Sequence, residues 1–584
     1  MKSITACLFL SVLADGQQMV SVASFGADPT GVKDSLPAAR QAAQSLVASG
    51  GGTVCFPSGQ YKFDSYITAR SGDNYNLLTY TDNTTFAPCS GAVPGSVAIF
   101  QGPNGWGTAL HPAFGPIAVF NTSFFLSSSV GQNGYQNRTQ NGGYYTLQSP
   151  LAAGAMSATF ANPIQAANCP AGEWIAISTS NQQTGAISPL EINQVLSSNS
   201  STGAVTLRWP QTVGYPTYSG NGSGVFAACV SPMVRQNVKI TGLTLRTSAG
   251  ILLNDLYNVE FDGNHIQCDS TYVSRCRFFF SNGVRHLVAQ NNILDHYPSS
   301  SGSFPKVDWA NNNPIDLYIS GNTMDTGSSA GSEYAEHAIF SQNKVRGGGV
   351  FSGFDIHVES NDFTAVVSQM YGQVSDNSTG PNPYLFPFQG TKFIGNRISG
   401  IGGGGGLNAT LILYQPDTQV ISNTISTALN EIAIATQCCR TGIAPQHTIV
   451  GNDIHCDAYT GPYGCIIIQG SAVDGDLISG NNLVGTNGST VGVAVQDYSS
   501  SSTGVIIITG NSQTGFSTVG PKINLSKHMC PVINSLQVNS CAPLVNILSK
   551  IPIAANNAAA VAAGVPMWGL YRSGGNPDVV SVVH

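Results

Sequence analysis

Ionisable side chains are concentrated between Asp295 and Asp362. This window holds 9 of the chain's 30 carboxyl groups in 68 of its 584 residues. It also holds three histidines, His296, His337 and His357, and cationic side chains that include Lys344 and Arg346. Hydrolysis of a glycosidic bond needs two carboxyl groups, whereas β-elimination needs a base and cations that neutralise the carboxylate of the sugar. The window therefore contains the groups for either reaction on a polysaccharide.

Seven residues of this window form the candidate catalytic set. The preferred candidates are Asp308, Glu333, Glu336, His337 and Lys344, and the second choices are Asp325 and His357. Glu333 and Glu336 lie three positions apart, so they share a face only if their segment is helical or tightly turned. Long turns that leave a repeat are also polar because they are solvated, and this second interpretation of the cluster stays open.

Two smaller patterns also have both a chemical and a structural interpretation. His357 and Glu359 alternate with apolar residues on an expected strand, so we expect both side chains to face outward about 7 Å apart. They could act as an acid/base pair or simply belong to a solvated face of the strand. The solvated face is the favoured interpretation. The apolar run Phe278–Phe280 is flanked by three arginines, Arg275, Arg277 and Arg285. One interpretation is that they bind uronate carboxylates, and the other is that they form ion pairs with Asp269 or Glu260.

The elements that position these residues belong to a short repeat between Val238 and Gln513. Its pattern is apolar, any, apolar, any, Gly or polar, Asn, any, apolar, as in Leu317–Met324. The aligned asparagines are Asn264, Asn291, Asn322, Asn343, Asn361, Asn396, Asn423, Asn452, Asn481 and Asn511, with Leu243 in that place one copy earlier. Period-2 alternation within such a repeat indicates stacked strands. Asparagines about 4.8 Å apart would form a hydrogen-bonded ladder, so the repeat predicts a parallel β-helix, right-handed like other parallel crossovers.

A second register supports this interpretation. Five short apolar strands upstream of the later asparagines each end in glutamine: Gln389, Gln415, Gln437, Gln469 and Gln496. We expect these glutamines to stack at another turn of the coil. A β-sandwich with polar loops would not require amides at both turns.

The N-terminal part carries a family resemblance. Residues 34–46 predict a helix, with Asp34 or Ser35 as its cap, Pro37 in its first turn and glycines at 50–52 after it. The order Ser-Phe-Gly-Ala-Asp, Thr-Gly, Asp-Ser, helix, Gly-Gly-Thr-Val-x-Phe-Pro-x-Gly-x-Tyr closely resembles the beginning of the pectate-lyase-like superfamily, which includes rhamnogalacturonase- and epimerase-like domains, polysaccharide lyases and viral tailspikes. The resemblance is specific over residues 20–65 and fold-level to about residue 515. It implies a β-helix whose open N-terminal end is covered by the helix, which would protect strand edges and core side chains.

The resemblance does not carry catalytic residues with it. The chain lacks a matching set of the Asn-Thr-Asp, Asp-Asp, His-Gly and Arg-Ile-Lys motifs of the pectin-hydrolase branch. It also lacks the Asp-Pro-x-His run of alginate epimerases, of which Leu294–Tyr297 is only a loose echo. Lyases of this fold use clustered carboxylates to bind Ca²⁺, so we expect Ca²⁺ only if the chain is a lyase, and no linear calcium motif is present.

The predicted organisation is all-β, with a single right-handed parallel β-helix. Residues 1–14 read as a signal peptide, 20–65 as an N-terminal cap with the first coil, 66–230 as early coils with a strand-rich insertion, 231–515 as regular coils, and 516–584 as a small C-terminal cap and tail. Residues 563–575 are similar to a short terminal motif of some phage and large-virus structural proteins.

Charge and cysteine content predict a secreted, disulfide-bonded glycoprotein without a membrane anchor. A net charge of −7 argues against nucleic acid as a partner. Loss of Cys7 with the signal peptide would leave 12 of the 13 cysteines, an even number. Pairing in order gives Cys55–Cys89, Cys169–Cys229, Cys268–Cys276, Cys456–Cys465 and Cys530–Cys541, and leaves Cys438 and Cys439, which compete for Cys456 or Cys465. Nine Asn-x-Ser/Thr sequons give weak support for glycosylation.

We therefore expect a secreted protein that acts on polysaccharide as a lyase or a glycoside hydrolase, with uronate-containing glycans among its candidate substrates. The alternative is a non-catalytic glycan-binding or virion surface protein. An enzyme should bring several charged residues together with shifted pKa values, whereas an adhesin should have evenly polar faces.

Overall fold

The computed structural model describes residues 18–63, 81–101, 145–178, 190–212, 235–369, 389–436 and 446–517, the ranges 235–369, 389–436 and 446–517 with short gaps. It also describes short strands elsewhere, the last of which ends at Val582.

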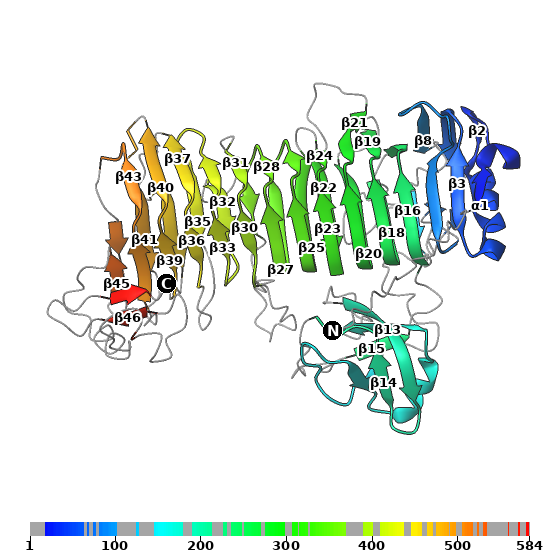
Figure 1. Cartoon of the computed structure of the whole chain (residues 1–584), viewed down its shortest axis with the longest axis horizontal. Coiled ribbons are helices and arrows are strands. Elements are labelled where there is room, and N and C mark those ends of the chain that lie inside the picture. The colour runs from blue at the N-terminus through cyan, green and yellow to red at the C-terminus, as the bar shows by residue number, and fades with distance from the viewer. Residues whose placement is uncertain are drawn as a thin grey trace, which may run out of the picture.

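Most strands stack in three rows along the length of the molecule (Figure 1). A coil passes through row 1, turns a corner into row 2, turns again into row 3 and then enters row 1 of the next coil. Rows 1 and 2 form one 25-stranded sheet because four long strands bend around their corner: β18 (Gly250–Asp262), β20 (Arg275–Gln290), β25 (Ser328–Ser341) and β27 (Gly349–Glu359). Row 3 is a separate 14-stranded sheet. The predicted right-handed parallel β-helix is confirmed.

The remaining strands of the coils are shorter. Row 1 contains β6 (Asn74–Leu77), β9 (Phe124–Ser127), β22 (Lys306–Asn312), β29 (Val367–Ser368), β32 (Ala409–Leu413), β35 (Ile432–Thr436), β38 (Ile466–Gly470), β41 (Val493–Asp497) and β44 (Lys522–Asn524). Row 2 contains β1 (Met19–Ser21), β3 (Gly52–Phe56), β7 (Thr84–Pro88), β16 (Arg235–Thr241), β23 (Ile315–Ser320), β30 (Lys392–Ile394), β33 (Gln419–Ile421), β36 (Thr448–Val450), β39 (Leu477–Ser479), β42 (Val505–Thr509) and β45 (Cys530–Ile533).

Row 3 contains β2 (Thr30–Asp34), β4 (Gly59–Phe63), β8 (Val97–Gln101), β17 (Thr244–Thr247), β19 (His265–Asp269), β21 (Ile293–Tyr297), β24 (Thr323–Met324), β26 (Lys344–Val345), β28 (Asp362–Phe363), β31 (Arg397–Ser399), β34 (Thr424–Ser426), β37 (Asp453–Asp457), β40 (Asn482–Thr486) and β43 (Ser512–Thr514). Two antiparallel pairs lie outside this pattern: β5 (Ile67–Thr68) with β6, and β46 (Leu570–Arg572) with β47 (Val580–Val582).

Alternation of apolar residues builds one core inside the coils. In β23, Leu317 and Ile319 are buried while Tyr318 between them is exposed. The same alternation along the rows gives a single buried cluster from Val22 to Ile508. The predicted N-terminal helix is α1 (Leu36–Ser45). The backbone N–H of Leu36, its first residue, donates a hydrogen bond to Asp34 Oδ1. Its buried residues join the core at the end of the solenoid (Figure 1).

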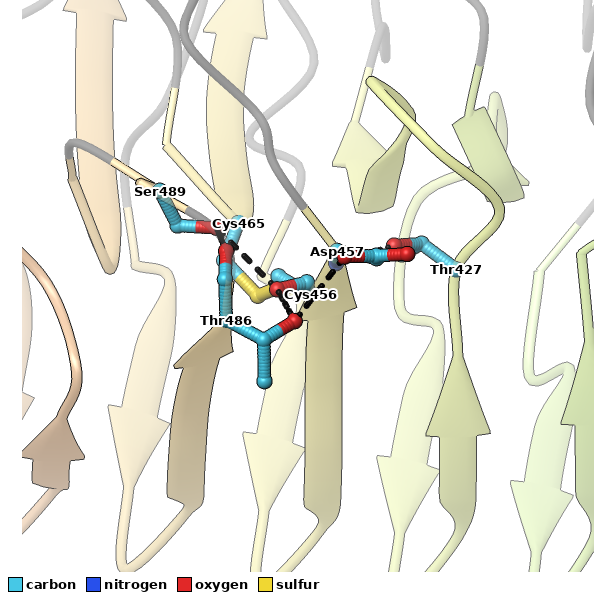
Figure 2. Close-up of a disulfide and its surroundings, with 6 residues drawn as sticks. All are labelled: Thr427, Cys456, Asp457, Cys465, Thr486 and Ser489. Atoms are coloured by element: carbon cyan, nitrogen blue, oxygen red, sulfur yellow. Dashed lines mark hydrogen bonds between the residues drawn. A yellow bond between two sulfur atoms is a disulfide. The ribbon is translucent and has the colours of Figure 1, made fainter.

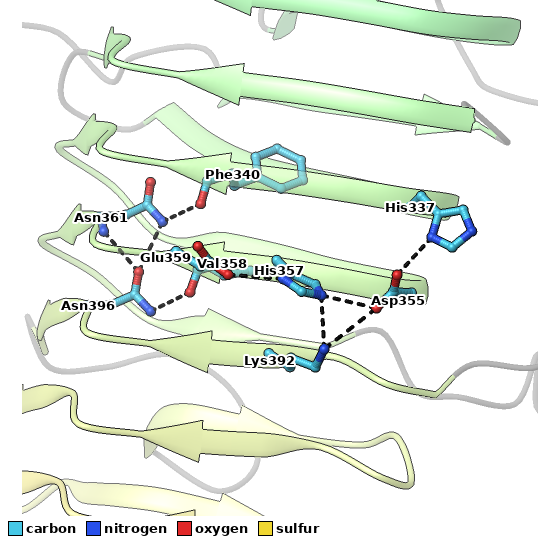
Figure 3. Close-up of polar contacts among 9 residues, drawn as sticks. All are labelled: His337, Phe340, Asp355, His357, Val358, Glu359, Asn361, Lys392 and Asn396. Carbon is cyan, nitrogen blue, oxygen red and sulfur yellow. Dashed lines mark hydrogen bonds and ion pairs between the residues drawn. The ribbon is translucent and has the colours of Figure 1, made fainter. Parts of the chain in front are cut away.

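A ladder of buried asparagines holds the corner between rows 2 and 3. In each member Oδ1 accepts both the backbone N–H and the Nδ2 of the asparagine one coil earlier, as Asn396 does from Asn361 at 2.9 and 3.0 Å (Figure 3). Nδ2 also donates to a row 2 carbonyl, as Asn361 does to Phe340 O at 2.8 Å. The ladder therefore satisfies both the side-chain amides and the backbone groups of a turn that water does not reach.

The predicted register of this ladder is wrong at one position. The member on the coil after Asn264 is Asn292, which is 1% exposed, and not Asn291. Asn291 occupies the preceding position, where its φ of 57° matches the left-handed conformation of Gly321 at 64°. Asparagine tolerates this conformation, so an Asn-Asn pair replaces the usual Gly-Asn pair and both residues fit the sequence pattern.

The predicted glutamine row is only partly present. Gln469 and Gln496 pair in register on row 1, and Gln415 is buried beside Gln369, whose Oε1 accepts its backbone N–H. Gln389 is exposed and pairs with Phe354 at the corner between rows 1 and 2, so its assignment to the row is wrong. Gln437 lies outside the described residues.

A lobe of antiparallel strands interrupts the early coils. Its six-stranded sheet has the order β10 (Tyr145–Thr146), β15 (Phe226–Cys229), β12 (Trp174–Ser178), β13 (Leu190–Asn199), β14 (Ala204–Leu207) and β11 (Ser157–Thr159). One 3-10 helix, η6 (Pro163–Asn168), packs with it. The lobe has an apolar cluster of its own around Phe160 and Ile175 and lies to one side of the solenoid (Figure 1).

Three of the predicted disulfides are present: Cys55–Cys89, Cys169–Cys229 and Cys456–Cys465. Beside Cys456–Cys465, the backbone carbonyl of Cys456 accepts hydrogen bonds from the hydroxyl groups of Thr486 and Ser489, which lie on the next coil (Figure 2). Cys456 and Cys465 are therefore bonded to each other, and neither is bonded to Cys438 or Cys439. The side chains of the other predicted partners lie outside the described part of the chain. No helix in the described part is long and apolar enough to cross a membrane.

The neighbours Asn291 and Asn292 test the register of the ladder. Asn292→Ala removes the acceptor of two donors and the donor to Phe261 O inside a buried turn. We expect it to lower the free energy of unfolding by about 3 kcal/mol, because each orphaned buried group costs about 1–3 kcal/mol. Asn291→Gly keeps the left-handed backbone and should change that energy by less than about 0.5 kcal/mol. Chemical denaturation compares the two variants, and equal losses would contradict this register.

Candidate functional site

The corner between rows 1 and 2 presents a column of polar side chains. One residue in each of several coils has a left-handed backbone there: Asn258, His286, Asp316, His337 and Asp355 have φ values of 55°, 60°, 56°, 54° and 55°. Asparagine, aspartate and histidine are enriched among the non-glycine residues in this conformation. The backbone of the corner thus favours short polar side chains, and the stacking of coils brings them next to one another.

Five ionisable side chains from three consecutive coils form one network at this corner (Figure 3). His337 Nδ1 lies 2.7 Å from Asp355 Oδ2, and His357 Nε2 lies 3.0 Å from Asp355 Oδ1. His357 Nδ1 lies 2.9 Å from Glu359 Oε1. Lys392 Nζ lies 3.1 Å from His357 Nε2 and 3.8 Å from Asp355 Oδ1. The residues come from the row 2 parts of β25, β27 and β30, and we call them the His337 network.

His337 is the member best placed for proton transfer. Its side chain is 44% exposed, and Asp355 holds Nδ1. Within the described part of the chain Nε2 of His337 has no hydrogen-bond partner, whereas both ring nitrogens of His357 have one. A carboxylate on Nδ1 places the proton of a neutral imidazole there and leaves Nε2 as the basic atom. His337 and Asp355 can therefore act as a base with its orienting carboxylate.

The electrostatics of Asp355 agree with that role. Partial burial by itself raises the pKa of Asp355, but the hydrogen bonds from His337 and His357 and the charges of the two rings outweigh it. The pKa of Asp355 is consequently lowered below 3.8. Asp355 is thus an anion throughout the neutral range and stabilises positive charge on the two imidazoles.

The structure brings two of the seven predicted residues together, His337 and His357. Lys344 is exposed on row 3, beyond the asparagine corner, in register with Thr323 and Asp362. Asp308 and Glu333 are on the row 1 parts of β22 and β25, and their side chains lie outside the described part of the structure. Asp325 lies outside the described residues altogether.

Glu336 belongs to a different environment, although it precedes His337. It is 1% exposed and faces the lobe, where Thr212 bonds its carboxyl group. The charged groups around it are Glu191 of β13, Arg285 of β20 and Asp316 of β23. We call the contact between lobe and solenoid the lobe junction. A buried carboxyl group in this junction is not reached by a polymer, so we do not assign Glu336 to the catalytic site.

Two carboxyl groups of the lobe junction have strongly shifted pKa values. Burial raises the pKa of Glu191 to about 7, against the opposing effect of Arg285. Burial also raises the pKa of Glu336 well above 4.5, and the nearby Glu191 raises it further. Arg285 pairs with Glu191 Oε1 at 3.5 Å and Asp316 Oδ2 at 4.0 Å, so the expected pairing with Asp269 or Glu260 is not the one it makes.

Sequence reasoning left three important residues out of the candidate set. Asp355 was inside the charged window, but nothing local showed that it would meet both His337 and His357. Lys392 lies beyond the window and reaches the network because its strand stacks on β27. Glu191 lies in the lobe, far upstream. His357 and Glu359 alternate with the buried Ile356 and Val358 as predicted, and their side chains also meet, with 2.9 Å between His357 Nδ1 and Glu359 Oε1.

Among the described residues, no group of three or more His, Cys, Asp or Glu side chains is arranged to hold a metal ion. The expectation of Ca²⁺ therefore has no ligand set in the part of the chain described here.

Comparison with solved structures finds several proteins of similar shape. The tailspike gp61 of Pseudomonas phage phi297 is 11% identical, with 85% of this chain and 80% of that chain covered and a TM-score of 0.43. The A-module of the Azotobacter vinelandii mannuronan C-5 epimerase AlgE6 is 12% identical, with 88% and 100% covered and a TM-score of 0.37. PfbA, a surface adhesin of Streptococcus pneumoniae, is 12% identical, with 86% and 91% covered and a TM-score of 0.33. The described strands form a parallel β-helix, which is the fold that the sequence resemblance implies. No protein-family profile and no curated protein sequence matches it.

Asp355→Asn tests the electrostatics of the His337 network. The pKa of Asp355 is lowered in the folded protein, so the carboxylate stabilises the fold above pH 3.8, and this stabilisation is lost as the pH falls through the lowered value. The side chain is 37% exposed and therefore screened, so we expect a loss of about 0.5–1 kcal/mol near neutral pH. Denaturation at neutral and acidic pH measures it, with Asp453→Asn as the control because its carboxylate, 3.4 Å from His455, is 49% exposed. A loss that stays constant down to acidic pH would refute this assignment.

Proposed function

We propose that this chain is a secreted protein that cleaves an extracellular, uronate-containing polysaccharide by β-elimination at the His337 network. The observation that carries the proposal is the exposed His337 imidazole, held at Nδ1 by Asp355. An elimination needs a base and a cation beside it, and this network contains both.

Each member of the network has a role in this reaction. Nε2 of His337 removes the proton from the carbon next to the uronate carboxylate, and Asp355 stabilises the imidazolium that forms. The electron pair of the broken C–H bond forms a C=C double bond while the glycosidic C–O bond breaks. The departing oxygen takes a proton from water. Lys392, whose side chain is 30% exposed, neutralises the uronate carboxylate and the negative charge that develops on it.

The two remaining members position these groups. Glu359 accepts from Nδ1 of His357, and the ring then holds its Nε2 between Asp355 and Lys392. The secreted location is supported by the disulfides, since such bonds persist in oxidising compartments.

A non-catalytic glycan-binding protein is the second candidate, and one observation favours it. Asp355, His357, Glu359 and Lys392 all have partners within the network, as ion pairs on a solvated surface do. Tyr318, 39% exposed on the same row, offers an aromatic ring on which a sugar can stack.

Incubation with a panel of acidic and neutral polysaccharides tests the proposal. A lyase gives products that absorb in the ultraviolet because each cleavage creates an unsaturated sugar, and it also gives new reducing ends. We expect His337→Gln to lower kcat by about 100-fold or more, which is the usual contribution of a general base. Asp355→Asn should lower kcat and shift the pH profile of kcat/KM, because the ring loses its orienting partner.

The matched control is His265→Gln. His265 also pairs with an aspartate, with 2.7 Å between its Nε2 and Asp295 Oδ2, but it lies on row 3. It should keep activity within about twofold, since surface changes away from a site have small effects. Reducing ends without unsaturated products would indicate a hydrolase and refute elimination. Silence in both readouts together with retained glycan binding would indicate the binding protein.

A further inference from the structure

The lobe rests on one column of side chains beside the corner between rows 1 and 2. Tyr257, Arg285, Ile315, Glu336 and Phe354 are aligned in register on consecutive strands. The Tyr257 ring lies 5.2 Å from the rings of both Trp174 and Trp209 of the lobe. The Arg285 guanidinium lies 4.5 Å from the centre of the Trp209 ring, and Phe354 packs against the lobe's apolar cluster.

Charge is not balanced in this lobe junction. Among the described residues, three carboxyl groups face it, those of Glu191, Glu336 and Asp316, and one guanidinium, that of Arg285. Full ionisation would give a charge of 1 − 3 = −2 from these groups. Arg208 lies 4.7 Å from the Trp209 ring, but it is exposed and donates to Gln194. Glu191 and Glu336 are 0% and 1% exposed, so solvent does not screen them. Burial of an unpaired ion is strongly unfavourable, and such a group takes up a proton instead.

The hydrogen bonds distinguish the two buried carboxyl groups. Glu191 Oε2 accepts the Thr212 N–H at 3.1 Å, and Oε1 meets Arg285 Nη1. Arg285 Nη1 also donates to the Ile192 carbonyl of the lobe at 2.9 Å. Glu336 Oε2 is buried without a hydrogen-bond partner. A carboxylate oxygen in that position would carry unsolvated charge, so the contacts favour a neutral Glu336.

We propose that protons on Glu336 and Glu191 latch the lobe onto the solenoid, and that the latch opens as the pH rises above neutral. Loss of these protons leaves two buried anions beside Arg285, the one buried cation that the described residues place in this contact. Separation of the lobe restores water to both carboxylates, and this hydration is the driving force for opening.

The direction of the pH dependence follows from the pKa shifts. The docked state raises the pKa of both groups, to about 7 for Glu191. Their contribution to docking is therefore complete below the ordinary value of 4.5 and is lost as the pH rises through the raised values. Docking should be firmest below about pH 4.5 and weaken progressively as the pH rises, with the contribution of Glu191 fully lost above about pH 7. The neighbouring Asp316, half-exposed, disfavours a charge on Glu191, while Arg285 favours it.

Thiol labelling of the full chain measures the open state. Ala176 is 0% exposed and lies in the apolar cluster with Trp174, Trp209 and Tyr257, so Ala176→Cys reacts only when the lobe separates. We expect its labelling rate, after correction for thiolate formation, to rise with pH above about 4.5, by up to about tenfold per pH unit for each linked proton, and to level off above the raised pKa of each group, about 7 for Glu191. The chain without this substitution gives the background. A corrected rate that does not change with pH would refute the latch.

Amide variants identify the groups that hold the protons. In the Ala176→Cys chain, Glu336→Gln should remove the part of the pH dependence that belongs to its proton, because the amide keeps the shape without titrating. Glu260→Gln is the matched control: Glu260 is 31% exposed and pairs with Lys239 on the same row, and its variant should keep the full dependence. If Glu336→Gln fails to fold, Glu191→Gln carries the comparison. An unchanged pH dependence in the folded variant of either buried glutamate would overturn the proposal. The labelling experiment requires no catalytic activity, so its outcome does not depend on whether the chain is a lyase.

Discussion

A buried side-chain amide at one corner of each regular coil keeps the coils of this solenoid in register. Each ladder asparagine accepts two hydrogen bonds and donates two, and the backbone of the turn has no other partners for these groups at that depth. A slip of one residue would bury a different side chain and leave several polar groups without partners, which is expensive in a dry turn. The positions of rows 2 and 3, and of every column of side chains on their outer faces, follow from this constraint.

The second corner shows how chemistry arises from a backbone requirement. The left-handed conformation between rows 1 and 2 disfavours most side chains, and histidine, aspartate and asparagine are enriched among the non-glycine residues that adopt it. Stacking then places His337 beside Asp355, although 18 residues separate them in the sequence. Charged partners that no local motif links are therefore brought together by the coil. The same requirement explains why polar residues occupy this corner in coils that take no part in the network, such as that of Asn258.

Local signals predicted the features that local physics determines. The coil strands follow from period-2 alternation, α1 from its Pro37 and flanking glycines, and Cys456–Cys465 from a short spacing. The prediction of the ladder was wrong only where Asn291 and Asn292 both satisfied the sequence pattern. The choice between them depends on which residue adopts the left-handed backbone conformation. Lys344 illustrates a stronger limit: its distance from His337 depends on the asparagine corner between them, because residues seven apart can lie on different rows. The assignment of Gln389 to the glutamine row failed for the same reason, because this residue lies at the corner between rows 1 and 2, where it makes an isolated bridge to Phe354.

Glu336 and His337 show why the site as a whole was beyond the reach of the sequence. They are adjacent, yet one is 1% exposed and the other has a side chain that is 44% exposed, because the chain turns the corner between them. The burial of Glu336 depends on a lobe whose own Glu191 precedes it by more than a hundred residues. A single peptide bond thus connects the lobe junction to the His337 network.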